Sequence, residues 1–132
     1  MIQNAQGQIL LGLRKGSHGA GEWSFPGGHL EFGETIFETV SREVKEETDL
    51  DVGELSVISL ADEMRYIETD NKHHLAITVR AQYLGGEPKI MEPNKCLEWR
   101  WFDLNNQPDN LLEANQLTLA NLKAGVIYKP AR

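Results

Sequence analysis

A glutamate-rich stretch from about Glu34 to Thr48 contains the residues best suited to chemistry. Its apolar residues recur at helical spacing, so we predict a helix whose core face carries Ile36, Phe37, Val40 and Val44. On a wheel of about 100° per residue, Glu43 and Glu47 lie one turn apart and flush with that apolar face. Burying two unpaired carboxylates costs several kcal/mol unless a cation neutralises them. Their placement therefore predicts a metal site.

The other charges of this helix have a simpler interpretation. The same wheel places Glu34, Glu38 and Lys45 opposite the core, which is typical of a solvated face. Glu38 and Arg42 stand four residues apart, a spacing that favours an ion pair on a helix surface. We therefore expect these residues to face solvent.

Mg²⁺ is the metal that such a site favours. It takes oxygen ligands, keeps several waters and is completed by the phosphates of a substrate, and Mn²⁺ is the expected substitute. Zinc is excluded, because the chain has one cysteine, Cys96, and no His-Glu-x-x-His spacing. We interpret Cys96 as a packing residue. Asp49-Leu50-Asp51 begins like a calcium loop, but the further ligands do not follow.

Strands and a second helix are expected around this site. Apolar and β-branched runs predict strands at Gln8–Arg14, Leu55–Leu60, Met64–Ile67, Leu75–Leu84 and Trp99–Phe102. A second helix, containing Leu111, Leu112, Leu119 and Leu122, should end near Gly125. Several glycines between Gly16 and Gly33 predict a loop that lets backbone approach a ligand. The pattern favours an α+β fold, an α/β/α sandwich with a mixed β-sheet between helices.

From Gly28 to Leu50 the sequence resembles the Nudix box. The matching residues, at the spacing of that motif, are Gly28, Glu34, Arg42, Glu43, Val44, Glu46, Glu47 and Leu50. The segments RKGSHGAGEWSFPGGHLEFGET and EPNKCLEW, from Arg14 to Thr35 and from Glu92 to Trp99, are similar to the MutT-like nucleoside triphosphate diphosphatase branch. The resemblance implies one Nudix hydrolase domain over residues 1–132.

The resemblance also implies an activity, the hydrolysis of a nucleoside diphosphate linked to a further group. For a nucleoside triphosphate, damaged and deoxy forms included, the products would be a nucleoside monophosphate and pyrophosphate. The residues that it assigns to the metal are Gly27, through its carbonyl, and Glu43, Glu46 and Glu47. Three acids are candidates for the general base, Glu43, Glu46 and Glu92, and the sequence leaves the choice among them open.

Four further residues are candidates for substrate binding: Arg14, Lys15, Gly28 and His29. Arg14 and Lys15 would hold the outer phosphates, and the competing interpretation is a solvated strand end. His29 would touch the substrate or pack beside the helix. By resemblance Arg42 orients the acids, against a simpler role as a surface partner of Glu38. The remaining histidines and the tryptophans near these elements are interpreted as core residues: His73, His74, Trp23, Trp99 and Trp101.

Two positions depart from the family pattern. Asp49 stands where the box has a late glycine, so we expect a left-handed residue at the helix end, at a cost of about 1 kcal/mol. Its negative charge also lies at the unfavourable end of the helix dipole. Met1–Gln3 resembles only the tail of a first strand, so either the chain starts upstream or the sheet has a short edge there.

Charge and composition exclude several partners. Thirteen Lys and Arg against twenty Asp and Glu give a net charge of −7, which disfavours polymeric nucleic acid and anionic membranes. One cysteine and the lack of a long apolar run indicate a cytoplasmic protein, and analogy with the MutT-like branch suggests a homodimer.

Two alternatives to triphosphate hydrolysis stay open. The first is another substrate, ADP-ribose or a nucleotide sugar, although Arg65 and Tyr66 stand where the ADP-ribose branch generally has a proline. The second is a non-catalytic nucleotide sensor, which is disfavoured because every acid of the box is present.

Overall fold

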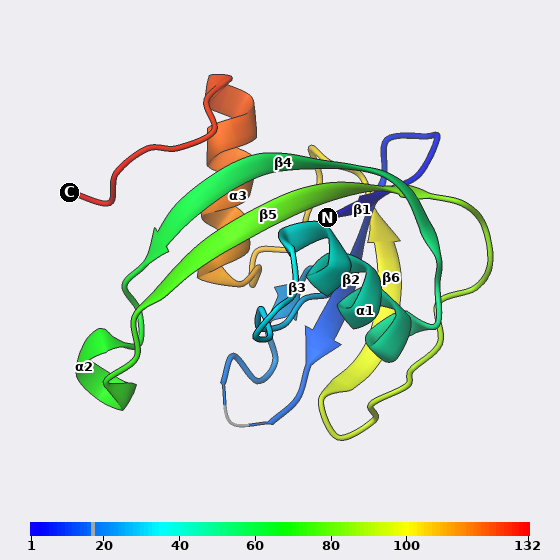
Figure 1. Ribbon diagram of the computed structural model, residues 1–132, viewed down its shortest axis with the longest axis horizontal. Helices are drawn as coiled ribbons and strands as arrows, with labels where there is room; N and C mark the ends of the chain where they lie inside the picture. The colour runs from blue at the N-terminus through cyan, green and yellow to red at the C-terminus, as the bar shows by residue number, and fades with distance from the viewer. Residues whose placement is uncertain (17) are drawn as a thin grey trace.

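The computed structural model describes residues 1–16 and 18–132, which form a mixed sheet with helices on both of its faces. Its strands are β1 (Ile2–Gln3), β2 (Ile9–Arg14), β3 (Trp23–Ser24), β4 (Val52–Glu63), β5 (His74–Tyr83) and β6 (Cys96–Phe102). The strand order is β3-β2-β1-β5-β4, with β6 paired to β2; β1 and β5 are parallel and the other pairs are antiparallel. Helix α1 (Ile36–Thr48) and helix α3 (Glu113–Ala124) cover opposite faces (Figure 1). This confirms the expected sandwich.

Strand β2 divides the core in two because its side chains alternate across the sheet. Leu10 faces α1 and packs with Ile2, Val44, Leu50 and Ala81. Ile9 and Leu11 face the other side and pack with Met1, Trp23, Phe25 and Leu111, against which Leu119 and Leu122 of α3 also lie. The sheet is therefore buried on both faces, and its central strand leads directly into the glycine-rich segment.

Both ends of helix α1 follow from local sequence. Thr35 is the N-cap, and its hydroxyl and the Glu38 carboxylate form a reciprocal capping box. Asp49 ends the helix in the left-handed conformation at φ 61°, as predicted. Its carboxylate lies 3.4 Å from Lys45 Nζ and 2.9 Å from Lys89 Nζ, so two lysines offset the unfavourable dipole.

The predicted strand at Met64–Ile67 is wrong. Strands β4 and β5 pair as far as Glu63 and His74, so the residues between them must reverse the chain. They do so through a turn and the short helix α2 (Ile67–Asp70), which ends at a left-handed Asn71. A short apolar run does not distinguish a strand from a single helical turn.

Three further expectations need correction. Phe37 is 42% exposed, because α1 buries Thr39, Val44 and Thr48 and its first turn buries no apolar residue. The last strand starts at Cys96 rather than Trp99, and β3 lies within the segment predicted as a loop.

Across the described residues, no helix combines the length and apolarity needed to cross a membrane.

Candidate active site

Arg42 is the centre of the charge network on α1. Its guanidinium binds Glu34 through two hydrogen bonds, Nε to Oε2 at 2.7 Å and Nη2 to Oε1 at 2.9 Å. Nη1 donates to Glu43 at 2.8 Å and to Glu46 at 3.2 Å, and Nη2 donates to the His29 carbonyl at 3.0 Å. One arginine thus links the loop before α1 to three acids of the box.

This network corrects two expectations. Glu34 is not on a solvated face: its side chain is 17% exposed, and its hydrogen bonds to Arg42 lower its pKa to about 2. The wheel did not apply to Glu34, because the helix starts after the N-cap Thr35. Glu38 belongs to the capping box, and the carboxylates that contact Arg42 come from other positions. The orienting role of Arg42 is therefore the interpretation that the contacts support.

Glu47 is the most perturbed acid of the site. Burial raises its pKa to about 8, and the nearby charges of Glu43 and Glu92 act in the same direction. The Gly27 N–H donates to Glu47 Oε2 at 3.0 Å and opposes the shift, as does the charge of Arg14. A partly buried carboxylate with a raised pKa is a group that a bound cation would stabilise in its charged form.

Gly28 is required by the position of Glu43. A Cβ placed on Gly28 would lie 2.2 Å from the carboxyl carbon of Glu43, which is closer than any real contact. The loop backbone therefore approaches the Glu43 carboxylate as only a glycine can. Gly27 thus binds Glu47, and Gly28 leaves the space that the Glu43 carboxylate occupies.

The donors around α1 suit a hydrated magnesium ion. Within residues 1–16 and 18–132, no three Asp, Glu, His or Cys side chains are already gathered at metal-binding distance. Mg²⁺ needs only one or two carboxylates, since waters and substrate phosphates complete its shell. Glu43 and Glu47 both lie against the loop before α1. Glu46 is 53% exposed, and it is linked to Glu43 through its contact with Arg42. Oxygen donors with partly buried carboxylates among them fit this ion, and the ligand assignment itself stays a prediction.

The loop acid Glu92 lies near this group. It precedes β6, and its backbone carbonyl accepts hydrogen bonds from the N–H groups of Lys95 and Cys96. Its side chain is half-buried beside Lys95, and its charge is close enough to raise the pKa of Glu47. All three candidates for the general base are thus near α1, on its surface or on the adjoining loop.

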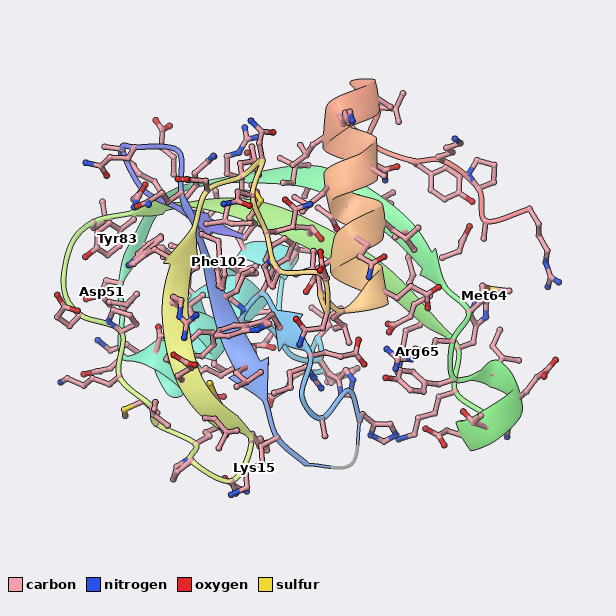
Figure 2. All side chains as sticks on the ribbon, turned by 180° about the vertical axis from the view of Figure 1, so that it is seen from behind. Lys15, Asp51, Met64, Arg65, Tyr83 and Phe102 are labelled. Carbon is pink, nitrogen blue, oxygen red and sulfur yellow. The ribbon has the colours of Figure 1, made fainter. Side chains whose placement is uncertain are left out.

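The predicted substrate residues differ in how they are held. Arg14 is half-buried, and its Nε donates to the His18 carbonyl at 3.0 Å. Lys15 is exposed where β2 ends (Figure 2), and its backbone N–H binds the Lys95 carbonyl. The His29 ring is exposed and lies 5.5 Å from the ring of His74, the first residue of β5.

The core interpretation of the histidines and tryptophans holds only in part. Trp23 is buried, and Trp99 and Trp101 pack partly buried beneath α1. His73 is exposed, because it lies in the turn before β5 rather than inside the strand. His74 is half-buried, with Nδ1 3.7 Å from Glu63. Sequence reasoning missed its approach to His29, since a separation of dozens of residues leaves no periodic signal.

The comparisons with known proteins agree with this geometry. Residues 1–122 match the family model described as NUDIX domain. The chain belongs to the Nudix family. Its fold is similar to that of a MutT NUDIX hydrolase from Burkholderia pseudomallei, with a TM-score of 0.80, 29% identity, and 90% of this chain and 93% of that chain covered. The resemblance to the Nudix box and to the MutT-like branch is confirmed.

Two curated relatives are named for different substrates. An ADP-ribose pyrophosphatase of Methanocaldococcus jannaschii is 38% identical over 104 residues, 76% of this chain and 57% of the relative. An oxidized purine nucleoside triphosphate hydrolase of Danio rerio is 32% identical over 111 residues, 84% of this chain and 68% of the relative. The chain thus spans little more than half the length of the archaeal relative and about two-thirds of the zebrafish one.

Proposed function

We propose that this Nudix protein is a Mg²⁺-dependent pyrophosphohydrolase that cleaves nucleoside triphosphates to a nucleoside monophosphate and pyrophosphate. The observation that carries the proposal is the partly buried Glu47 carboxylate, held by Gly27 beside Glu43, in a chain with a MutT-like fold. The zebrafish relative, named for oxidized purine nucleoside triphosphates, makes damaged nucleotides a substrate class to test first.

Each residue of the site has a proposed role in the attack of water on a phosphorus atom of the anhydride bond that is cleaved. Gly27, Glu43, Glu46 and Glu47 would hold Mg²⁺, which supplies charge neutralisation on the phosphates and makes water more acidic. Glu43, Glu46 or Glu92 would take the proton of the attacking water, and cleavage of the α–β anhydride bond would release a nucleoside monophosphate and pyrophosphate. Arg42 keeps the acids in place through its hydrogen bonds to Glu34, Glu43 and Glu46.

Four residues are proposed to contact the nucleotide. Arg14 and Lys15, at the end of β2, would bind the outer phosphates of the substrate. Gly28 and His29 would line the loop side of the site, where the backbone passes close to Glu43. In this proposal the cations would lie on the strand side of the phosphates and the carboxylates on the helix side.

The test is a panel of nucleoside triphosphates, including oxidized purine forms, assayed for pyrophosphate and orthophosphate with Mg²⁺. The proposal predicts pyrophosphate as the product, with activity lost in Glu47→Gln. Gln variants of Glu43, Glu46 and Glu92 identify the general base as the position whose loss lowers kcat and removes the rise of activity with pH on the acidic side of the profile. Orthophosphate as the sole product would contradict the proposal.

ADP-ribose is the second candidate substrate, because the archaeal relative carries that activity in its name. Hydrolysis would yield AMP and ribose 5-phosphate without pyrophosphate, and a nucleotide sugar would yield a nucleoside monophosphate and a sugar phosphate. Both belong on the same panel, measured as release of AMP or the corresponding monophosphate. Turnover of these compounds alone would replace the triphosphate proposal, and tight binding without any turnover would indicate a sensor module.

A further inference from the structure

The turn between β4 and β5 contacts the segment between β2 and β3 at three points. We call Arg65–Asp70 the hairpin tip and His18–Glu22 the glycine loop. Arg65 binds Glu22 through two hydrogen bonds of 2.8 and 3.1 Å. His18 Nε2 lies 2.6 Å from Asp70 Oδ2, and its ring meets Tyr66 edge-on at 5.0 Å. Figure 2 shows Arg65 at the base of α2, on the side of the loop that follows β2.

The two loop residues held by the tip, His18 and Glu22, are also hydrogen-bond partners of Arg14. The His18 carbonyl accepts from Arg14 Nε at 3.0 Å, and the Glu22 carbonyl accepts from the Arg14 backbone N–H at 2.8 Å. Gly19, at φ +68°, passes so close that a Cβ there would lie 2.9 Å from Arg14 Nε. The loop therefore wraps the Arg14 side chain, and the tip secures the loop at both of its ends.

A glycine-containing loop needs such support if it is to keep a cation in one place. Glycine backbones lose more conformational freedom on ordering than any other residue, and an unsupported loop would let the guanidinium move. Arg14 stands opposite Cys96 in the β2–β6 pair, and the Cys96 N–H donates to the carbonyl of Glu92, so the position of Arg14 matters to the candidate site.

We propose that Arg65 and Asp70 are positioning residues that hold the glycine loop so that Arg14 faces the substrate phosphates. The inference rests on the proposed phosphate role of Arg14. Exposed ion pairs contribute little to folding stability, so the contacts of the tip should act mainly on substrate binding. The turn that the sequence predicted as a strand then has a task at the site.

The first test is steady-state kinetics of Arg65→Ala and Asp70→Asn, with inorganic pyrophosphate as a competitive inhibitor. KM for the best triphosphate and Ki for pyrophosphate should each rise about fivefold, the most that an exposed ion pair usually contributes. The value of kcat should stay within about twofold, because the reacting groups are untouched. Glu68→Gln, an exposed position on the same short helix, is the matched control and should behave as wild type.

Two double variants separate positioning from a general loss of structure. Exchanging the charges in Glu22→Arg with Arg65→Glu should restore KM toward the wild-type value, whereas each single variant raises it. In an Arg14→Ala background, Arg65→Ala should cause no further rise, because the two changes act through the same cation. Melting temperatures of all variants should lie close to that of wild type.

The outcomes distinguish this inference from the function on which it rests. A raised KM in Arg14→Ala with an unchanged KM in Arg65→Ala and Asp70→Asn would overturn the inference alone. An unchanged KM in Arg14→Ala itself would overturn both the phosphate role and the inference. A lowered melting temperature and kcat with an unchanged KM would assign the tip a purely structural role and would also overturn it.

Discussion

Gly28 is a residue whose backbone passes close to a carboxylate of the candidate site, that of Glu43. Its Cα stands so near the Glu43 carboxylate that a methyl group would overlap it. We predict that Gly28→Ala displaces Glu43 and lowers kcat about 100-fold, the loss expected from a misplacement of about 1 Å. Steady-state kinetics beside circular dichroism would check this, because the fold should persist. Full activity in Gly28→Ala would show that Glu43 tolerates a different position.

Arg42 is the second residue on which the geometry of the acids depends. Its planar fork binds Glu34 twice while another nitrogen reaches Glu43, an arrangement that lysine cannot reproduce. We predict that Arg42→Lys lowers activity at limiting Mg²⁺ by about tenfold. Glu38→Gln is the control, because glutamine preserves the capping box and Glu38 lies outside the network. Equal losses in both variants would mean that helix stability, rather than orientation of the acids, is responsible.

At the scale of elements, the C-terminal end of α1 has Asp49 where the family motif has a glycine. Asp49 adopts the left-handed conformation and forms ion pairs with Lys45 and Lys89. We predict that Asp49→Gly unfolds with a free energy about 1 kcal/mol higher than Asp49→Ala. Both variants lose the carboxylate, so urea denaturation of the pair isolates the backbone strain. Equal stabilities would show that the left-handed residue carries no strain.

The elements that the sequence predicts well are those with a sustained period. Helix α1 follows from apolar residues at helical spacing, and β2 and β5 follow from long β-branched runs. Glu43 and Glu47 can be predicted as a pair because they lie one turn apart on that helix, whereas Glu34 precedes it. Strand β3 was hidden among glycines, and the contact of Arg65 with Glu22 joins residues 43 positions apart, for which spacing carries no signal.

At the scale of the whole molecule, the two-sided core explains how the sheet positions the carboxylates of α1. The sheet packs α1 on one face and α3 on the other, so Val44 and Leu50 anchor α1 while its acids face the loop. A divalent cation between these acids and a substrate would overcome the repulsion expected from a net charge of −7. The homodimer and the exclusion of polymeric nucleic acid and membranes stay predictions of the sequence.

The partly buried Glu47 should make the free energy of unfolding depend on pH when metal is removed. Its pKa is about 8 in the folded protein against an ordinary value of 4.5. A group whose pKa is raised by folding stabilises the protein fully below the unfolded value, and this contribution is lost as the pH rises through the folded value. With EDTA, the free energy of unfolding should therefore fall between about pH 4.5 and pH 8. Urea denaturation across this range should show a smaller fall in Glu47→Gln, and identical slopes would contradict the burial of Glu47.

The most direct measurement of the central claim is the product released from a nucleoside triphosphate by wild type and by Glu47→Gln, each with Mg²⁺ and with EDTA. Phosphorus NMR distinguishes pyrophosphate from orthophosphate in the same sample. We expect pyrophosphate and nucleoside monophosphate from wild type with Mg²⁺. We expect no turnover from wild type with EDTA or from Glu47→Gln under either condition. Undiminished pyrophosphate release by Glu47→Gln, or release in EDTA, would contradict a magnesium site built on α1.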